Sequence, residues 1–411
     1  MPILLEEDLQ RPLPRMYRVR QQFDETRLED VAGTVRAELA KPEIRALVKP
    51  GMRIAVGVGS RGIQNFYTIV ETTVNSLKEL GAEPFIVSAM GSHGGGTEEG
   101  QREVLAGYGI TEERLGVPVV TTVDTVYLGN CANGRPVWFD RAAYEADLIV
   151  PINRVKLHTD FVGPIQSGLC KMLVIGLGNH KGCSAVHEEA PEVFADAIEE
   201  TARLILQKAP VGFGIAILEN AYDKTYDVEA VPAEHLVERE KELVQIAKGN
   251  MPYIMLDEAD VIVCGAIGKD ISGAGFDPNI LGRSSVLKQF VLHIPRYQRL
   301  VLCDVTPASH GNGIGVGLFD VITKKVAEQL DLESMYANAI ACNCLGDASV
   351  PCTVDDEETA IRVALKCCRN IDRDHPRIIR IQNTLHLGEI EVSEALLDAV
   401  RADSRMSLIE N

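Results

Sequence analysis

Histidine and lysine side chains, which can transfer protons, bind a metal or form covalent bonds, are concentrated in one stretch of the chain, residues 153–187. The five that stand out are His158, Lys171, His180, Lys181 and His187. Glycines are interleaved with them, and glycine lets a backbone approach a ligand closely. Imidazole and amine groups supply proton transfer, metal ligation and covalent attachment. This mixture is not typical of a hydrophobic core, so the stretch predicts a ligand site.

Lys171 has an apolar setting, between Leu169-Cys170 and Met172-Leu173. Because apolar surroundings disfavour the ammonium form, Lys171 is a candidate nucleophile. The alternative is a lysine that extends its charged end to solvent at the end of a strand.

The other basic residues of the stretch also allow two interpretations each. His187 opens the acidic segment HEEAPEVF, and it is either a metal ligand or a histidine at a helix start. His180 and Lys181 either contact a phosphate or cap a turn.

Two βα units precede this stretch and predict where its partners lie. Residues 52–59 read as a strand, followed by the loop SRG and a helix from 64 to 80. Residues 83–90 read as a second strand, followed by the loop GSHGGG and a helix capped by Thr97. Ligands bind at the carboxyl ends of strands in open α/β sheets. We therefore expect Ser60, Arg61, Ser92 and His93 to share one crevice.

A third strand, residues 146–153, leads into the stretch and should bring His158 to the same edge as His93. Two histidines on separate loops suit a mechanism with two bases, although each histidine could instead fix a loop. The forked donors of Arg61 suit a carboxylate or phosphate, and a surface salt bridge is the alternative. Lys269 and Asp270 lie in a polar loop that would face a cleft between two domains.

The remaining pattern predicts further α/β structure. Short strands are expected within 117–139, with a hairpin turn at Asn133-Gly134. After residue 187 we expect a helix at 191–208, a strand at 211–220 and a helix at 233–249 closed by Gly249. The rest of the chain predicts strands at 259–265, 299–305 and 377–382, and helices at 317–330, at 357–370 and from Ser393. At 411 residues the chain exceeds one comfortable core. We expect two α/β domains, 1–255 and 256–411, with the active-site cleft between them.

Composition narrows the classes of partner and compartment. The net charge of −18 argues against nucleic acid or an anionic membrane as a partner, because either needs a basic surface. The N-terminus lacks the features of a secretory signal, and no apolar run reaches eighteen residues, so we expect a cytoplasmic protein. Ten cysteines fit reduced thiols, and Cys342, Cys344 and Cys352 lack the paired spacing of a structural zinc site.

The glycine-rich loops GSHGGG and IGLGNHKG do not form a dinucleotide or P-loop fingerprint. Glycine-rich turns can still offer backbone N–H groups to a phosphate, so a mononucleotide-like ligand remains open.

Taken together, these motifs resemble the lactate racemase-like (LarA-like) isomerases, which use a nickel-pincer nucleotide. The resemblance is carried by SRG with Arg61, GSHGGGTEEG with His93, HTDF with His158, GLCKMLVIGLG with Lys171, and by His187, all in the family's order. The interval from Lys171 to His187 is similar to that between the family's cofactor-bearing lysine and metal-ligating histidine. The resemblance runs over nearly the whole chain, including the C-terminal VSEALL.

The resemblance implies a cofactor, pyridinium-3,5-bisthiocarboxylic acid mononucleotide with nickel, held in the cleft between two domains. It implies Lys171 as the covalent tether and His187 as the nickel ligand. Ser60, Gly176, Gly178, His180 and Lys181 would surround the cofactor. By the same resemblance His93 and His158 would be the paired acid/bases, and Arg61 and Lys269 would bind the substrate.

The implied activity is that of a racemase or epimerase of a 2-hydroxy acid. The α-hydrogen would leave as hydride to the cofactor while one histidine takes the hydroxyl proton, and the opposite histidine would complete the return. The implied partners are this small acid and, transiently, the proteins that make the cofactor; a homo-oligomer is compatible with the pattern.

Two alternatives remain open at this point: a metal- or nucleotide-binding protein without turnover, and a zinc-dependent hydrolase using the same histidines. The chain also differs from lactate racemase. Val58-Gly59-Ser60 stands where that enzyme has an aspartate, and His158 is farther from Lys171. We therefore expect a larger or more polar acid than lactate, such as a sugar acid.

Overall fold

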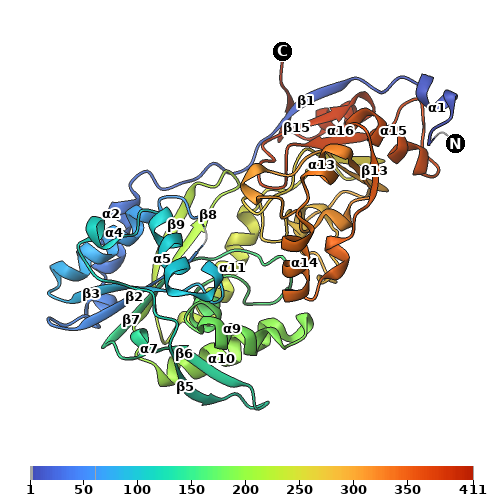
Figure 1. The fold of residues 1–411 in the computed structure, drawn as a ribbon. Helices are drawn as coiled ribbons and strands as arrows, with labels where there is room; N and C mark the ends of the chain where they lie inside the picture. Colours follow the sequence, from blue (N-terminus) through green and yellow to red (C-terminus); the bar gives the residue numbers. More distant parts are fainter. Residues whose placement is uncertain (1–2, 61, 411) are drawn as a thin grey trace. The chain divides into compact units, whose positions relative to one another are not determined.

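The chain folds into two α/β units, and the computed structural model describes residues 3–60 and 62–410 (Figure 1). The first unit, called the site unit below, comprises residues 25–251. The second, called the C-terminal unit, comprises residues 252–410 together with residues 3–24. Both contain parallel strands and helices, so the predicted α/β class is confirmed. The predicted cleft between domains stays a prediction.

The site unit is built on a six-stranded sheet. In spatial order its strands are β4 (Val119–Val120), β3 (Glu83–Ser88), β2 (Arg53–Val58), β7 (Leu148–Arg154), β8 (Phe213–Glu219) and β9 (Thr225–Pro232). Neighbours pair in parallel except β8 and β9, which are antiparallel. Strands β2, β3 and β7 are buried along almost their whole length. This explains why they read as near-continuous apolar runs in the sequence.

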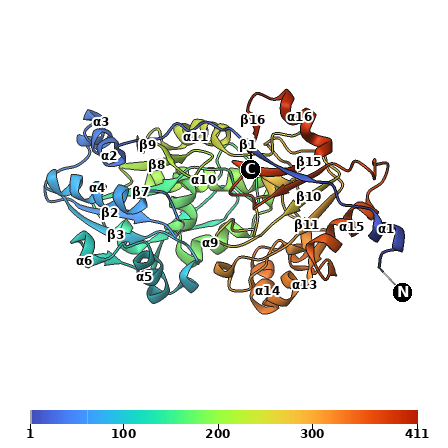
Figure 2. The same cartoon turned by 90° about the horizontal axis from the view of Figure 1, so that it is seen from above.

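Helices pack on this sheet and supply its core (Figures 1 and 2). They are α2 (Val31–Leu39), α3 (Pro42–Arg45), α4 (Phe66–Glu79), α5 (Glu98–Gly107), α6 (Glu112–Leu115), α7 (Arg141–Tyr144), α8 (Leu169–Lys171), α9 (Asn179–His187), α10 (Phe194–Lys208) and α11 (Leu236–Asn250). Ile54 and Val56 of β2 share one buried cluster with Ile69 and Val74 of α4. The predicted cap of α5 is confirmed, because the Thr97 hydroxyl accepts the Gly100 backbone N–H at 3.1 Å.

A two-stranded hairpin, β5 (Thr125–Asn130) and β6 (Pro136–Asp140), is attached to this unit. Its turn includes Asn133 and Gly134, as predicted, and Gly134 has a φ of 87°, which favours glycine. Buried Asp140 accepts the side-chain N–H of Asn179 at 2.8 Å. Burial raises the pKa of Asp140 to about 6. This contact ties the hairpin to the start of α9.

The C-terminal unit contains an eight-stranded mixed sheet. In spatial order its strands are β13 (Cys352–Val354), β12 (Val321–Thr323), β11 (Arg299–Leu302), β10 (Val261–Cys264), β14 (Ile378–Ile381), β15 (Glu389–Ser393), β1 (Met16–Gln21) and β16 (Met406–Leu408). The strands from β13 to β14 are parallel, and the others are antiparallel. The helices of this unit are α1 (Glu6–Gln10), α12 (Pro278–Leu281), α13 (Lys324–Gln329), α14 (Leu332–Ala341), α15 (Glu357–Cys367) and α16 (Leu397–Ala402).

The first strand of the chain belongs to the C-terminal unit, which differs from the predicted division at residue 255. Strand β1 pairs with β15 and β16, so residues 3–24 complete a sheet formed mainly by the other end of the chain. Half of the residues in β1 are arginine or glutamine, and a short strand of this kind gives no sign in the sequence of a partner at the other end of the chain. The structure divides the chain again between Met251 and Pro252, whereas the sequence predicted its single division between residues 255 and 256.

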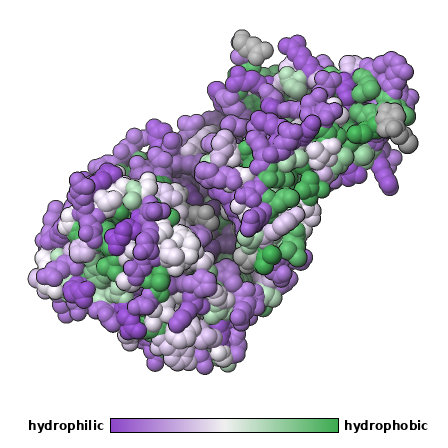
Figure 3. Space-filling view, in the orientation of Figure 1, coloured by the Kyte–Doolittle hydropathy of each residue, from purple (hydrophilic) through white to green (hydrophobic). Residues whose placement is uncertain are grey.

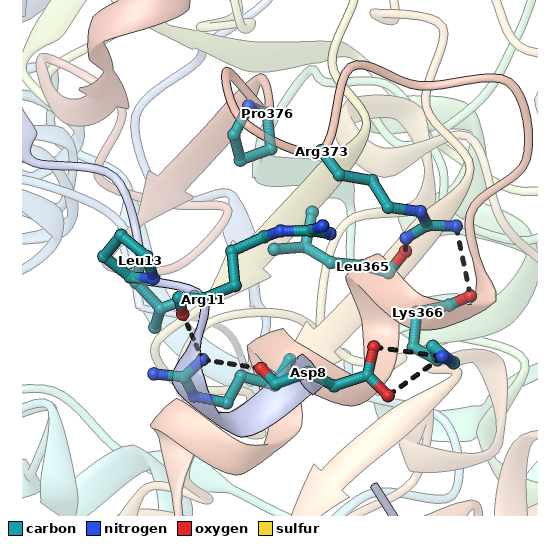
Figure 4. A pocket seen from close by; sticks show the side chains of 9 residues that line it. Asp8, Arg11, Leu13, Leu365, Lys366, Arg373 and Pro376 are labelled. Carbon is teal, nitrogen blue, oxygen red and sulfur yellow. Dashed lines mark hydrogen bonds and ion pairs between the residues drawn. The ribbon is translucent and has the colours of Figure 1, made fainter. Parts of the chain in front are cut away.

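Side-chain contacts hold the N-terminal helix α1 against α15, as Figure 4 shows for Asp8 and Lys366. The Lys366 ammonium lies 2.9 Å from the Asp8 carboxylate and lowers the pKa of Asp8. Arg362 donates to the backbone carbonyls of Asp8 at 3.0 Å and Arg11 at 2.6 Å. The polar side chains of this small pocket are therefore engaged in holding the N-terminal segment.

Three predicted elements were wrong in detail. Residues 317–330 form β12 followed by α13 rather than one helix, because Val321-Ile322-Thr323 adds a short β-branched strand beside β11. Ser393 ends β15, and the last α-helix begins at Leu397. Gly249 lies inside α11, which ends one residue later. Strand β9 was not predicted, because its half-buried, charged sequence hides an antiparallel edge strand.

Apolar side chains are exposed on one face of α14, where Leu332, Tyr336 and Ile340 recur at four-residue spacing. Figure 3 shows hydrophobic residues gathered over this region of the C-terminal unit. The predicted homo-oligomer stays a prediction. Among the residues that the structure describes, no helix combines the length and apolar character needed to span a bilayer.

Candidate functional site

Two of the predicted residues meet beyond the carboxyl ends of β2 and β3. The Ser60 hydroxyl forms a short hydrogen bond with Nδ1 of His93. The Tyr108 hydroxyl donates to the backbone carbonyl of Ser60 at 3.0 Å and helps to fix that loop. The parallel pairing of β2 with β3 explains this meeting, because both strands end at the same edge. Arg61, the predicted substrate-binding residue, lies outside the described residues.

His158 follows β7 and contacts Lys171. Its Nε2 lies 2.5 Å from the Lys171 Nζ. Its Nδ1 accepts the backbone N–H of Asp160 at 3.1 Å, and its own backbone N–H donates to the Gln166 side chain at 2.8 Å. Because Nδ1 is an acceptor, a neutral His158 carries its proton on Nε2. The structure thus brings together two residues that the sequence singled out separately.

The backbone that carries Lys171 is unusual. Helix α8 runs directly into a π-helical turn, η2 (Met172–Gly176). Such turns are rare and are frequently found at functional sites. Lys171 ends α8 rather than a strand, and its side chain is half-buried, so the strand-end interpretation was wrong.

A fully buried carboxyl group, Glu240 of α11, binds the backbone of this helix. It accepts the backbone N–H of Cys170 at 2.8 Å. Gly168 is needed at the helix start, because a Cβ there would lie only 2.6 Å from the Glu240 carboxyl carbon. Burial raises the pKa of Glu240 to about 7, although the backbone N–H groups of Cys170 and Leu169 favour its charged form. Sequence reasoning missed Glu240, which read as one charge among many in α11.

His187 is the last residue of α9, so the interpretation as a helix-start histidine was wrong. Its Nδ1 lies 2.7 Å from the backbone carbonyl of Cys183, to which an Nδ1–H donates. That bond fixes the tautomer in which Nε2 keeps its lone pair. Metal-binding histidines are commonly oriented by such a bond from the other ring nitrogen. His187 therefore has the local geometry of an Nε2 metal ligand.

The Cys183 thiol lies 3.5 Å from the same Nδ1 of His187. Burial, the largest single influence, lowers the pKa of His187, but the combined contacts with Cys183 outweigh it and raise that pKa. Burial likewise raises the pKa of the Cys183 thiol, but the contacts with His187 and Ser92 together lower it. A Cys–His pair four residues apart on a helix was visible in the sequence and was overlooked.

Two phenylalanines connect the two histidines of the stretch. Phe161 stacks on His158 with 4.2 Å between ring centroids, and Phe194 lies 4.8 Å from Phe161. Phe194 also meets His187 edge-on at 5.1 Å. Both phenylalanines are buried. They restrict the ring planes of His158 and His187, and no motif in the sequence pointed to this role.

The structure gives local contacts to the residues whose roles the sequence left open. Lys181 Nζ lies 4.8 Å from the centre of the Trp138 ring in the hairpin, a cation–π contact. His180 is exposed beside the glycine turn at Gly96. Gly176 packs against the backbone after β3, where a Cβ would lie 2.7 Å from the Ala89 carbonyl oxygen. The cofactor-binding roles of these residues and of Gly178 stay predictions.

Lys269 lies in the C-terminal unit, in the loop after β10. Its Nζ donates to the backbone carbonyl of Gly273 at 2.6 Å and to the Asn338 side chain of α14. Its backbone N–H donates to the Ser309 hydroxyl at 2.8 Å. The loop is thus well anchored, and the substrate-binding role of Lys269 stays a prediction.

A metal at His187 would need donors from outside the protein chain. Within residues 3–60 and 62–410, no three His, Cys, Asp or Glu side chains are grouped so as to hold a metal ion. A catalytic zinc site takes three protein ligands. Among the described residues, His187 is thus not accompanied by two further protein ligands of the kind that a catalytic zinc takes.

Comparison with known proteins agrees with the resemblance seen in the motifs. The fold is similar to that of the lactate racemase apoprotein from Thermoanaerobacterium thermosaccharolyticum, with a TM-score of 0.53 and 13% identity over 89% of this chain and 93% of that chain. It is also similar to a protein from Thermotoga maritima, with a TM-score of 0.50 and 13% identity over 80% and 85% of the two chains. At this identity the likeness concerns the fold alone.

A family model matches the N-terminal part of the sequence. Residues 11–196 match the model of the lactate racemase N-terminal domain, and this range contains His93, His158, Lys171 and His187. No curated protein matches the chain. Residues 11–196 are thus similar to the lactate racemase N-terminal domain, and the fold of the chain is similar to that of a lactate racemase.

Proposed function

We propose that this protein is a racemase or epimerase that acts on the carbinol carbon of a 2-hydroxy acid with a nickel-pincer nucleotide as cofactor. The observation that carries the proposal is the set formed by His93, His158, Lys171 and His187, which all lie within the matched N-terminal domain. Their contacts suit proton transfer at two positions, a reactive amine and one metal-binding imidazole.

Lys171 and His187 are the residues that would hold the cofactor. Lys171 would anchor it through the amine, and the Nε2 of His187 would be the protein's ligand to nickel. When bound, the cofactor supplies an acceptor and donor for the α-hydrogen of the substrate, which is too weakly acidic for simple proton abstraction.

Proton transfer at the substrate hydroxyl would fall to His93 and His158. The Ser60 hydroxyl beside His93 can donate to Nδ1 or accept from it. Nε2 of His93 can therefore act as an acid or as a base, as a reaction that runs in both directions requires. His158, by contrast, receives a donor at Nδ1, so the neutral ring carries its proton on Nε2 and can donate a hydrogen bond to the substrate hydroxyl. For His158 to exchange a proton as an acid/base, the bond from Asp160 to Nδ1 would have to break, because the imidazolium carries a proton on both nitrogens.

A larger or more polar acid than lactate remains the proposed substrate class. Val58-Gly59-Ser60, which carries no charge, stands where lactate racemase has an aspartate a few residues before the substrate arginine. Sugar acids are the first class to test.

The test is a loaded enzyme. The full chain is made together with the cofactor-biosynthesis proteins, and nickel content and the mass of the Lys171 peptide are measured. A panel of chiral 2-hydroxy acids is then assayed in deuterated water. We expect stoichiometric nickel, a mass adduct on Lys171 and inversion of at least one acid without exchange of its α-hydrogen with solvent.

Substitutions assign the roles. His93→Ala and His158→Ala should each lower turnover by about 100-fold or more, because each removes a proton-transfer group. His375→Ala is the matched control, since that side chain is 75% exposed. Neither nickel nor an adduct would refute the cofactor assignment. Nickel with no turnover on any acid would favour the binding-protein alternative.

A further inference from the structure

We infer that His158 has a second role in the cofactor-free protein, where its Nε2–H donates to Lys171 and holds that side chain as a neutral amine. The juxtaposition that carries this inference is the contact of 2.5 Å between His158 Nε2 and Lys171 Nζ, together with the bond from Asp160 to Nδ1.

The hydrogen bond at Nδ1 determines which nitrogen of the His158 imidazole carries the proton. Nδ1 receives the backbone N–H of Asp160, which is a donor at every pH, so Nδ1 carries no proton of its own. The single proton of the neutral ring is then on Nε2, which faces Lys171. An ammonium at Lys171 would direct a second donor at this N–H. A neutral amine instead offers its lone pair, and the contact becomes a normal hydrogen bond.

The charged groups that the structure describes around this pair act in both directions. His187 lies near enough that the Lys171 charge lowers the His187 pKa, so the two cations disfavour each other. Asp160 Oδ2 lies 4.0 Å from His158 Nδ1 and is half-exposed, which weakens its pull. Glu240, buried under the same helix, keeps its proton up to about pH 7, because burial raises its pKa. Above that pH its negative charge acts in the other direction and favours an ammonium, but its carboxylate is bonded to the backbone N–H of Cys170.

A neutral lysine at rest matters for attachment of the cofactor, a consequence that rests on the proposed function. An amine attacks an acyl carbon through its lone pair, which an ammonium lacks. In this step the lone pair would leave its hydrogen bond with His158 and form the C–N bond, while the hydroxyl or thiol group of that carbon and one proton of the nitrogen would depart together as water or hydrogen sulfide. Once the nitrogen is acylated its lone pair is no longer available, and His158 loses this acceptor. The same Nε2–H can then donate a hydrogen bond to the substrate. His158 would therefore act first on the lysine and later on the substrate.

Competitive acetylation of the cofactor-free, full-length protein tests the inference. Trace acetic anhydride acylates only neutral amines, and mass spectrometry compares the rate at Lys171 with the rates at exposed Lys208 and Lys224. An ordinary lysine has a pKa near 10.4, so its rate rises about tenfold per pH unit from pH 7 to 9. We expect a nearly constant rate at Lys171 over this range, at least tenfold above the exposed lysines at pH 7.

Three variants separate this role from simple exposure. His158→Ala should restore the tenfold rise per pH unit at Lys171, because the donor is gone. His158→Gln, which can place an amide N–H near the same point, should keep much of the flat profile. His93→Ala should leave the Lys171 profile unchanged. The shape of the profile does not depend on access of the reagent, so partial burial of Lys171 does not mimic the result.

Two results would overturn the inference: a tenfold rise per unit at Lys171 in the unaltered protein, or a flat profile that survives in His158→Ala. Its failure is separable from failure of the proposed function. A flat Lys171 profile in a protein that never acquires nickel or an adduct keeps the inference and rejects the function. A tenfold rise per pH unit at Lys171, found in a protein that does acquire nickel and is active, rejects the inference and keeps the proposed function.

Discussion

Replacement of Glu240 by glutamine should make the site unit more resistant to alkaline pH. The carboxyl group is fully buried beneath the helix that carries Lys171, and burial raises its pKa from 4.5 to about 7. Between these values the folded protein keeps a proton that the unfolded chain has lost. The free energy of unfolding therefore falls as the pH rises through this window. The stabilisation is complete below 4.5 and is lost as the pH rises through about 7.

The magnitude follows from the two pKa values. Between pH 5.5 and 8.5 the unfolded chain loses almost all of its remaining protons at this group, while the folded protein passes through its own midpoint. The loss over this range amounts to about 2 kcal/mol. Glu240→Gln does not titrate, and its amide oxygen can still accept the Cys170 N–H. As the pH rises from 5.5 to 8.5, the free energy of unfolding of the variant should therefore increase by about 2 kcal/mol relative to that of the parent.

Trp138 provides the assay. It is the sole tryptophan of the chain and lies in the site unit, so its fluorescence during denaturation by urea reports the unfolding of that unit. The free energy of unfolding of parent and variant is measured at both pH values, and its change with pH in the parent is subtracted from its change in the variant. This double difference cancels the titration of all groups that the two proteins share. A double difference near zero, or one of opposite sign, would show that Glu240 is ionised in the folded protein at pH 5.5.

Three further predictions concern other residues of the site unit. Gly168→Ala should lower the free energy of unfolding by about 1–3 kcal/mol, because its Cβ would meet Glu240; Gly249→Ala, with open space around the new Cβ, should instead raise it by about 0.5–1 kcal/mol in the same urea assay. Ser60→Ala removes a hydrogen bond to an imidazole and should lower kcat of the loaded enzyme about tenfold, with KM little changed, in steady-state kinetics. Phe161→Leu should cost about 1–2 kcal/mol by loss of ring contacts, measured as a shift of the urea midpoint.

The fold could be predicted where local pattern and burial coincide. The strands β2, β3, β7, β8 and β10 are short apolar runs with clear ends, and each was predicted within a few residues. The failures share a physical cause. Strands β1 and β9 are buried only in part, and both carry charged residues at their more exposed positions. Their sequences therefore lack a continuous apolar run. A distant partner such as β15 leaves no local signal.

The candidate site shows the same limit at the level of single residues. Groups that perform chemistry, such as His93, His158 and Lys171, have side chains that stand out beside glycines or apolar neighbours. Strand order then brought Ser60 to His93, as expected from parallel pairing. That His158 meets Lys171 was not predicted, because the path of residues 159–170 has no regular period.

The residues that position this chemistry are harder to find than the residues that perform it, and Glu240 shows why. It lies 70 positions from Cys170, on a helix whose other acidic side chains face solvent or form ion pairs. Nothing in its own neighbourhood distinguishes it. Its partner Gly168 also has no distinguishing neighbours in the sequence. The two residues nevertheless depend on each other, since a Cβ at Gly168 would collide with the carboxyl group of Glu240. The direction of Lys171 therefore depends on a contact that is defined only when the chain is folded. A substitution at either position should disturb the reactive lysine without touching it.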